Sequence, residues 1–428
     1  MKVLMFGWEF PPYISGGLGT ACFGLTKALA EKGTHITFIL PKIQQDAAES
    51  HVRLLGANRI SVTNLKKHIR EFRKNIQLLE IDSPLRPYLS PEVYTKMFSR
   101  IDRDVKTTAR DIEITGDFSG AYGPDLLSEI FRYSIIAGVY AAHQDFDVIH
   151  AHDWMTFPAG IRAKAVTGKP LVIHVHALEF DRSGDNIDTH VYEIEKAGME
   201  AADRVIAVSF YTRDRIIEKY GIPKEKIQVV HNAVSKEKHI ERLKIRRALN
   251  EKIVLFLGRV TFQKGPEYFI EAAHKVLCRL QDVRFVMAGT GDMFNRMVEM
   301  VAGNRIGRCF HFTGFLKGTV VERMYAMSDL YVMPSVSEPF GIAPLEAMLY
   351  DVPIIVSKQS GVAEILDHAI KVDFWDTDKL ADSIVSVLTQ PARTEEMVKN
   401  NTQQLSQIKW SIAAEKTLDV YRSLMGGM

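Results

Sequence analysis

Short apolar runs alternate with helical patterns along most of the chain, and this alternation constrains the fold more than any other feature. The apolar runs are bounded by Gly, Pro and polar residues, which is typical of buried strands. Strands separated by helical patterns of about 10 to 15 residues predict parallel sheets covered on both faces. The expected strands are 3–7, 35–40, 147–150, 171–175, 205–208, 227–230, 253–257, 283–288, 309–313, 330–333, 353–356 and 370–372.

The alternation occurs in two blocks, which are separated by the polar and highly charged stretch 232–250. A chain of 428 residues is also longer than one hydrophobic core normally supports. The sequence therefore predicts an α/β protein with two Rossmann-like, doubly wound parallel-sheet domains that face each other across a cleft. We expect the first domain at 1–235 and the second at 236–407, with a C-terminal helix at 408–428 that packs back on the first domain.

Composition argues against several classes of protein. The formal net charge of +2 does not favour nucleic acid or a membrane surface as a partner. Cys22, Cys278 and Cys309 are far apart and form no CxxC pair, which fits a reducing cytosol better than a disulfide framework or a zinc site. The N-terminal apolar run is too short for a signal peptide, and no stretch approaches the roughly 20 apolar residues of a membrane span. We expect a cytoplasmic protein without stable membrane insertion, and the sequence predicts no particular oligomeric state.

A glycine-rich loop follows the first expected strand. Gly16, Gly17 and Gly19 lie between a double proline and a helical pattern, as in strand–loop–helix units that bind phosphate. The dinucleotide fingerprint Gly-x-Gly-x-x-Gly fits Gly17 and Gly19, but Cys22 occupies its third glycine position. The loop thus indicates either a close approach to phosphate without the dinucleotide signature, or simple close packing.

The stretch Tyr331–Met348, YVMPSVSEPFGIAPLEAM, places two carboxylates after another expected strand. Glu338 precedes the turn at Gly341, and Glu346 lies inside the helix that follows. A turn before a helix exposes backbone N–H groups that suit an anion or a hydroxyl group. The two carboxylates could accept hydrogen bonds from sugar hydroxyls beside it, or they could be a capping residue and a solvated helical residue.

Two cations follow a strand in the segment FLGRVTFQKG. Arg259 and Lys264 lie between the buried strand and the next helix, where they suit a diphosphate, because Arg binds it bidentately and Lys as a point charge. The alternative is an exposed pair at the edge of a domain.

Two histidine pairs lie at strand ends, His150 and His152 next to Asp153, and His174 with His176. The HxH spacing suits metal ligands, so a metal-dependent hydrolase is one alternative. The inner histidines could instead be hydrogen-bonded core residues, and a metal site would leave the cationic pair and the paired carboxylates unexplained. We therefore expect no metal in the functional site.

These motifs together resemble those of retaining, nucleotide-sugar-dependent glycosyltransferases of the GT-B fold, in the group of glycogen and starch synthases and family 4 glycosyltransferases. The resemblance runs nearly end to end, through FPPYISGGLG, HAHDW, HVHALEFD, VVHNAV, LGRVTFQKG, AGTGD, FTGFL and SEPFGIAPLEAM. Each motif alone is modest evidence, but all of them in this order are highly specific.

The resemblance implies a catalytic role for five residues. Arg259 and Lys264 match the cations that hold the donor diphosphate, and Glu338 matches the residue that contacts the transferred sugar. His176 matches the histidine near the reacting carbon, and Asp153 matches the acidic residue of the HDW segment.

The resemblance also implies a set of donor-binding residues. Glu346 resembles the ribose-binding carboxylate, while the backbone around Gly341 would face the sugar and the phosphate. Two glycines of the first domain would approach the diphosphate, and two strand-end positions would accommodate the base. The donor-binding set is Gly16, Gly17, Gly289, Leu316, Gly341, Ile342, Ala343 and Glu346.

The implied activity is transfer of a hexose, with glucose as the first choice, from an ADP- or UDP-sugar to an α-glucan. The nucleotide sugar would be the substrate, and no cofactor is implied. One departure matters: glycogen synthases carry a lysine before the paired glycines, where this chain has Ile14. A family 4 enzyme that acts on another polysaccharide or on a lipid-linked acceptor therefore stays open.

The stretch 42–125 has the weakest pattern, with one expected strand at 76–81 and the basic run 66–74. That run fits a solvated helix face, or a mobile acceptor-side loop that would suit a membrane-proximal role. A non-catalytic nucleotide or glucan binder, and an epimerase or hydrolase of nucleotide sugars on the same fold, are the remaining alternatives.

Overall fold

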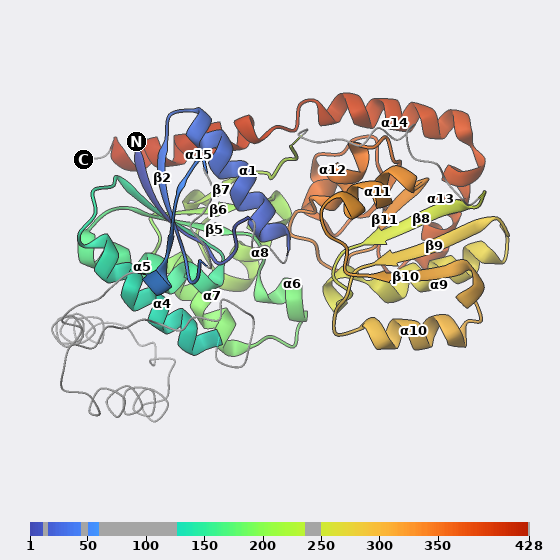
Figure 1. The fold of residues 1–428 in the computed structure, drawn as a ribbon, viewed down its shortest axis with the longest axis horizontal. Coiled ribbons are helices and arrows are strands. Elements are labelled where there is room, and N and C mark those ends of the chain that lie inside the picture. Colours follow the sequence, from blue (N-terminus) through green and yellow to red (C-terminus); the bar gives the residue numbers. More distant parts are fainter. Residues whose placement is uncertain (12–15, 44–49, 60–125, 236–249, 427–428) are drawn as a thin grey trace.

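The computed structural model describes residues 1–11, 16–43, 50–59, 126–235 and 250–426, which form two α/β domains. Each domain is a parallel sheet with helices on both faces, and the two domains lie side by side along the longest axis of the molecule (Figure 1). The predicted fold class of two doubly wound parallel-sheet domains is confirmed.

The first sheet has seven strands in the order β3-β2-β1-β4-β5-β6-β7. The strand order reverses at β1, which pairs in parallel with both β2 and β4. In such sheets, ligands bind beyond the carboxyl ends of the strands at this switch point. The strands are β1 Lys2–Phe6, β2 His35–Leu40, β3 Arg53–Gly56, β4 Val148–His152, β5 Leu171–Val175, β6 Arg204–Ala207 and β7 Ile227–Val229.

The second sheet repeats this plan with six strands in the order β10-β9-β8-β11-β12-β13. Its switch point lies between β8 and β11. The strands are β8 Lys252–Leu257, β9 Val283–Ala288, β10 Phe310–Gly314, β11 Leu330–Met333, β12 Ile354–Ser357 and β13 Ile370–Val372.

Helices cover both faces of each sheet, which explains why most strand residues are apolar. In β1, for example, Leu4 and Phe6 pack into one apolar core with α4, α5 and α7, while Val3 and Met5 pack into another with α1 and α15. The helices are α1 Gly17–Glu31, α4 Leu126–Ala141, α5 Phe157–Thr167, α6 Glu179–Ser183, α7 Thr189–Ala201, α8 Phe210–Tyr220, α9 Pro266–Leu277, α10 Phe294–Gly303, α11 Thr319–Met327, α12 Ala343–Met348, α13 Thr377–Thr389, α14 Pro391–Leu405 and α15 Trp410–Met425.

The chain crosses from the second domain back to the first along α14 and α15 (Figure 1). Helix α15 packs against α1, where the indole of Trp410 lies so close to Gly24 that an added Cβ would come within 2.2 Å of the ring. An ion pair of 2.6 Å between Lys32 and Glu415 joins the two helices at the surface. Residues 410–425 therefore supply part of the helical layer of the first domain.

Most expected strands agree with the structure, and β2, β5, β9, β11 and β13 agree at both ends. The pattern does not predict β3 or helix α5. Helix α5 contains Pro158 and Gly160, which weaken a helical pattern, yet Gly160 allows the helix to approach the sheet: an added Cβ would lie 2.8 Å from the side chain of Leu171.

Several predictions fall outside the described residues. These are the position of Ile14, the basic run 66–74 and the expected strand 76–81. The predicted boundary between residues 235 and 236 falls at the edge of the undescribed range 236–249, and the domain limits stay predictions. Within the described ranges, none of the helices has the length and apolar character needed to cross a lipid bilayer.

Candidate functional site

The residues singled out by the sequence lie at the carboxyl ends of strands in both sheets. Asp153 follows β4 and His176 follows β5 in the first domain, whereas Arg259, Gly289, Leu316 and Glu338 follow β8, β9, β10 and β11 in the second. Loops from these two edges touch across the domain interface: Ser209, after β6, donates a hydrogen bond of 2.6 Å to the backbone oxygen of Pro339, after β11. The fold thus places the candidate residues at the strand-end edges of both sheets, and loops from these two edges are in contact.

Lys264 and Glu338 form an ion pair at this interface. The Lys264 ammonium donates to Glu338 Oε2, and the hydroxyl of Ser335 donates to the same oxygen at 3.2 Å. The loop around Glu338 is also held by backbone hydrogen bonds of 2.9 Å with Gln359 and Gly361. Glu338 is 6% exposed, so its carboxylate is a buried charge that depends on Lys264 for neutralisation. An incoming diphosphate would compete for the ammonium and release the carboxylate toward neighbouring hydroxyls.

Arg259 differs from Lys264 in its surroundings. Its side chain is exposed, and its hydrogen bond from Nη2 to Gln263 Oε1 is long at 3.5 Å. A guanidinium held this loosely can turn toward an anion with little loss of existing contacts.

Two glycines of the predicted donor site have backbones that other residues adopt with difficulty. Gly289 has a φ of +147°, and an added Cβ would lie 1.8 Å from the backbone oxygen of Gly258. Gly341 has a φ of +100°, and an added Cβ would lie 3.2 Å from Glu338 Cγ. Both glycines are therefore required by the close packing of the strand-end loops.

Gly16 and Gly17 lie in a more open place. An added Cβ on either would meet no atom within 4 Å in the described part of the chain, and Gly17 begins α1. Packing among the described residues therefore does not explain why both positions are glycine. A close approach of the backbone to a ligand would explain it.

Glu346 lies in α12, below the turn that carries Gly341. Its Oε2 accepts a hydrogen bond of 3.0 Å from the Tyr325 hydroxyl. Burial raises the pKa of Glu346, and the hydrogen bond from Tyr325 acts in the opposite direction. Its amide bonds to the backbone oxygen of Ile342 at 3.0 Å, which closes the first turn of the helix that begins at Ala343.

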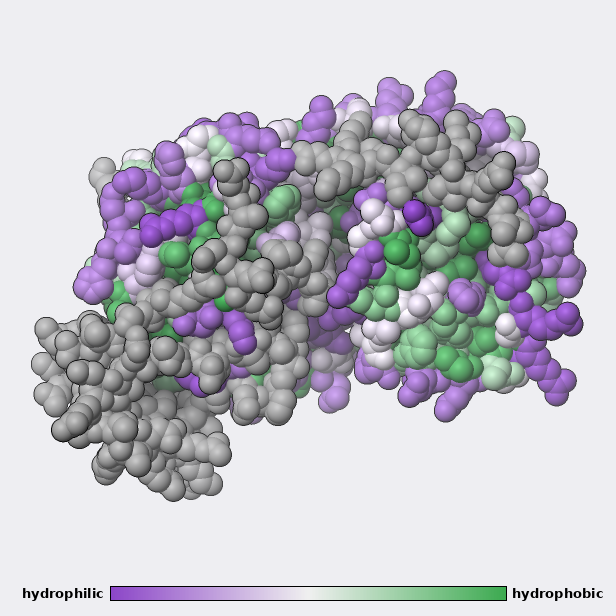
Figure 2. Space-filling model, in the orientation of Figure 1, coloured by the Kyte–Doolittle hydropathy of each residue, from purple (hydrophilic) through white to green (hydrophobic). Residues whose placement is uncertain are grey.

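Leu316 is half-buried in the loop after β10, next to Phe315, whose side chain is 54% exposed. In Figure 2 the second domain shows an apolar area in the region where Figure 1 draws β9, β10 and α10. An apolar area suits the flat face of a nucleobase, and the role of Leu316 stays a prediction.

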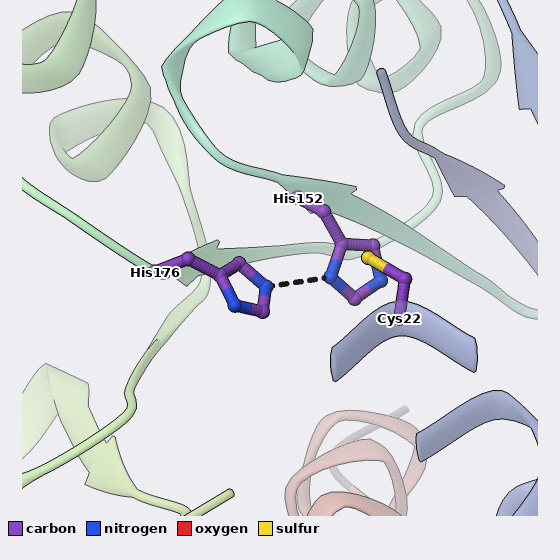
Figure 3. Close-up of side chains that lie close together, drawn as sticks. All are labelled: Cys22, His152 and His176. Carbon is purple, nitrogen blue, oxygen red and sulfur yellow. Dashed lines mark hydrogen bonds between the residues drawn. The ribbon is translucent and has the colours of Figure 1, made fainter. Parts of the chain in front are cut away.

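Four histidine rings stack against one another at the edge of the first sheet. The ring centroids of His150 and His152 lie 4.2 Å apart, and those of His174 and His176 lie 4.3 Å apart. Hydrogen bonds link the two strands, His150 Nε2 with His174 Nδ1 at 3.3 Å and His152 Nδ1 with His176 Nε2 at 3.1 Å (Figure 3). His150 also bonds to the Tyr421 hydroxyl of α15 at 2.5 Å.

This histidine stack is uncharged near neutral pH. Burial lowers the pKa of His150 and of His176 to about 3, and it lowers the pKa of His152 and His174 well below the usual value. His176, which is half-buried at the open end of the stack, would therefore act as a neutral hydrogen-bonding group.

Two groups of side chains in the described residues could in principle hold a metal ion, Cys22 with His152 and His176, and His150 with His152 and His174. The ligand atoms within each group lie within 4.8 Å of one another, and Figure 3 shows the first group. The imidazoles already bond to one another, and burial raises the pKa of the Cys22 thiol well above its usual value, which opposes the thiolate that a metal needs. Asp153 belongs to neither group.

Asp153 has an unusual backbone. It is a non-glycine residue with a φ of +65°, its amide donates to the backbone oxygen of His174 at 2.9 Å, and its Oδ1 accepts from the amide of Ala177 at 3.4 Å. Burial raises the pKa of the Asp153 carboxyl, while the nearby cation of Arg182 lowers it. Strained backbone of this kind is concentrated at functional sites.

The sequence did not indicate the buried ionic cluster that anchors α6. Arg182 Nη2 donates to Glu195 Oε1 at 2.5 Å and Arg182 Nε donates to Glu179 Oε2 at 3.2 Å, while the Tyr220 hydroxyl donates to Glu195. Burial alone would lower the pKa of Arg182, but Glu195, Asp153 and Glu179 raise it, so the guanidinium stays charged. The available signal was the segment EFDR, which follows His176 after two intervening residues.

The two halves of the chain match two family models. Residues 98–238 match the model described as Glycosyltransferase Family 4, and residues 235–404 match the model described as Glycosyl transferases group 1.

Similar proteins span the whole chain. An uncharacterised glycosyltransferase of Methanocaldococcus jannaschii is 29% identical over 444 residues, which cover 99% of this chain and 99% of that protein. A glycogen synthase of Mycobacterium tuberculosis is 24% identical over 435 residues, covering 100% and 96%. The solved structure of sucrose-phosphate synthase from Thermosynechococcus elongatus has a TM-score of 0.72 at 18% identity and covers 100% of both chains.

Proposed function

The chain is a glycosyltransferase of the GT-B type in the family 4 group, and from this premise we propose that it transfers glucose from an ADP- or UDP-linked donor to an α-glucan, with retention of anomeric configuration. Membership of this group covers the GT-B fold and the transfer of a sugar. The identity of the donor, the acceptor and the stereochemistry are our proposal.

The ion pair between Lys264 and Glu338 is the observation that carries the proposal. As the glycosidic bond breaks, its electron pair stays on the β-phosphate oxygen, and the developing charge would be stabilised by Lys264 and Arg259. Glu338, no longer neutralised by Lys264 alone, would accept hydrogen bonds from the hydroxyls of the transferred sugar. Removing one preorganised donor of this kind typically costs about 3 kcal/mol in the barrier.

Retention would arise by attack on the same face from which the nucleotide leaves. The acceptor hydroxyl would bond to the anomeric carbon while its proton passes to the departing phosphate. A glycosidase template requires an acid and a nucleophile about 5 Å apart across one bond. Glu338 is instead paired with Lys264, and Glu346 is bonded to Tyr325, so neither carboxylate is set up as that pair. His176 would orient the sugar as a neutral donor or acceptor.

An α-glucan acceptor is supported by the end-to-end similarity to a glycogen synthase. The second candidate is a family 4 enzyme that uses another polysaccharide or a lipid-linked acceptor, and Ile14 favours it, because the lysine found there in glycogen synthases is missing. In either case we propose a cytoplasmic enzyme that needs no metal ion or cofactor, because two side-chain cations face the expected diphosphate.

The test is release of nucleoside diphosphate from a panel of donors, ADP-glucose, UDP-glucose and other UDP- and GDP-sugars, with and without glycogen or maltooligosaccharides. EDTA is added in parallel, and the anomeric configuration of the product is determined by proton NMR. Glucan-dependent release from one glucose donor, insensitive to EDTA and with an α-linked product, is the expected result.

Other outcomes would change the proposal in defined ways. Release that ignores glucan would move the acceptor to another glycan, or the enzyme to a nucleotide-sugar hydrolase or epimerase. Activity lost on chelation would favour a metal at the histidine stack. Binding of a donor without any turnover would make the protein a nucleotide or glucan binder.

A further inference from the structure

Both residues that flank Glu338 are held by the first domain, and we propose that Asp181 and Ser337 are positioning residues that fix the Glu338 carboxylate at the donor site across the domain interface. Glu338 itself belongs to the second domain, in the loop after β11. The proposal rests on the proposed function for its kinetic consequence, but the structural consequence can be measured without any turnover.

Ser337, on one side of Glu338, has three polar partners from the first domain. Its hydroxyl donates to Asp181 Oδ1 at 2.5 Å and accepts from Arg215 Nη1 at 2.6 Å, and it lies 3.0 Å from the Tyr211 hydroxyl. Ser337 and Asp181 are 4% and 1% exposed, so water does not compete for these bonds. A short side chain is thus fixed by a buried carboxylate and a guanidinium at once.

Pro339, on the other side, is held through its backbone oxygen. That oxygen accepts hydrogen bonds from the hydroxyls of Ser209 at 2.6 Å and Thr212 at 3.2 Å. The contact is also close: an added Cβ on Gly361 would lie 2.2 Å from the Pro339 oxygen and 2.4 Å from Ser209 Cβ. The loop therefore has little freedom to shift relative to the first domain.

On the first-domain side of this contact, helix α6 is held by its own hydrogen bonds and lies close to His176 in the sequence. Asp181 lies in α6, which begins three residues after His176, and its Oδ2 accepts a hydrogen bond of 2.8 Å from the amide of Leu178. The neighbouring Arg182 is anchored in the ionic cluster described above. Helix α6 thus links the position of His176 to that of Glu338.

The same segment also touches the element that carries Lys264. Gly184, at the end of α6, lies against the ring of Phe262 in the short helix η5, Phe262–Lys264, and an added Cβ would come within 3.3 Å of that ring. The two members of the ion pair are therefore both placed against one segment of the first domain. A separation of the two domains would remove these first-domain contacts from Glu338 and Lys264 together.

The test compares Ser337→Ala with a matched control, Ser328→Ala. Ser328 is another fully buried serine of the second domain, and its hydroxyl bonds to the backbone oxygen of Met324 at 2.7 Å within that domain. Hydrogen–deuterium exchange is measured without substrate on the peptide that spans 335–342, and kcat and donor KM are measured with the preferred donor. Asp181→Asn, which keeps the shape of the side chain, serves as the second variant if Ser337→Ala folds poorly.

We expect Ser337→Ala to speed exchange of the 335–342 peptide at least about fivefold, because the hydroxyl that contacts three first-domain side chains is gone. The same variant should lower kcat about tenfold, with donor KM within about twofold of the unmodified protein. Asp181→Asn should lower kcat about threefold, and Ser328→Ala should change neither readout. Equal exchange in the two serine variants would overturn the proposal, as would an unchanged kcat in Ser337→Ala. If the unmodified protein shows no turnover, the proposed function fails, and the exchange measurement still decides the positioning role.

Discussion

Replacing Lys264 by methionine keeps the length of the side chain but removes the cation that faces Glu338. Among the described residues, the hydroxyl of Ser335, 3.2 Å away, is then the remaining side-chain donor to the Glu338 carboxylate. Breaking a buried ion pair from one side costs about 3 to 5 kcal/mol of folding free energy. The Lys264 side chain is 23% exposed, so water compensates in part, and we expect a loss of about 2 kcal/mol.

The effect on the reaction should be larger and of different origin. Lys264 would stabilise charge that develops only in the transition state, so its loss should lower kcat by about 10²- to 10³-fold. The double variant Lys264→Met with Glu338→Gln separates the two effects. It removes both charges, so it should recover most of the lost stability, within about 1 kcal/mol of the unmodified protein, without recovering kcat.

The assay is urea unfolding followed by circular dichroism for each variant, with nucleoside diphosphate release measured on the same preparations. If Lys264→Met unfolds at the same urea concentration as the unmodified protein, the Glu338 carboxylate does not depend on Lys264 for its stability in the fold. A kcat that falls less than tenfold in Lys264→Met would remove this lysine from the chemical step.

Three further predictions concern other parts of the site. Burial lowers the pKa of His174 well below its usual 6.5, so below pH 6.5 the unfolded chain binds a proton that the folded protein does not, and the free energy of unfolding falls on acidification. In urea unfolding at pH 7, 6 and 5, His174→Leu should reduce this loss of stability by up to about 1.4 kcal/mol per pH unit. A pH dependence equal to that of the exposed control His311→Leu would contradict the prediction. Gly289→Ala should destabilise the second domain by about 1 to 3 kcal/mol in the same assay, because its Cβ would collide with the oxygen of Gly258, and unchanged stability would show that the loop can move aside. Glu346→Gln should raise donor KM about tenfold and leave kcat within about twofold, as expected for a lost charge-assisted hydrogen bond to ribose; an unchanged KM in steady-state kinetics would remove Glu346 from the nucleotide site.

The strands could be predicted well because they are buried on both faces. Such strands are mostly apolar runs that end sharply at Gly, Pro or charged residues, as in β11, which lies between Asp329 and Pro334. Helix α5 could not be predicted in this way, because the small residues that let it approach the sheet also remove the apolar stripe that marks a helix. The sequence pattern reflects which residues are buried. It therefore predicts an element most clearly where all side chains of that element are buried alike.

The candidate site could be predicted in part for a related reason. Strand ends are visible in the sequence, and the side chains that follow them, such as Lys264 and Glu338, come together because parallel strands end at the same edge. Asp181 and Ser337 gave no such signal. They meet across a domain interface and lie 156 positions apart in the chain, so neither local sequence predicts the contact between them.

The return of α15 to the first domain affects how the chain can be made. During synthesis the N-terminal sheet emerges first, but the face of β1 that carries Val3 and Met5, together with His150, is covered in part by residues 410–425. Until those residues leave the ribosome, the nascent first domain presents an uncovered apolar layer while the whole second domain is still being translated. Chaperone demand on ribosome-bound chains should therefore persist through most of elongation, and a stop codon before residue 410 should yield a protein that aggregates through its N-terminal half even though that half is translated completely.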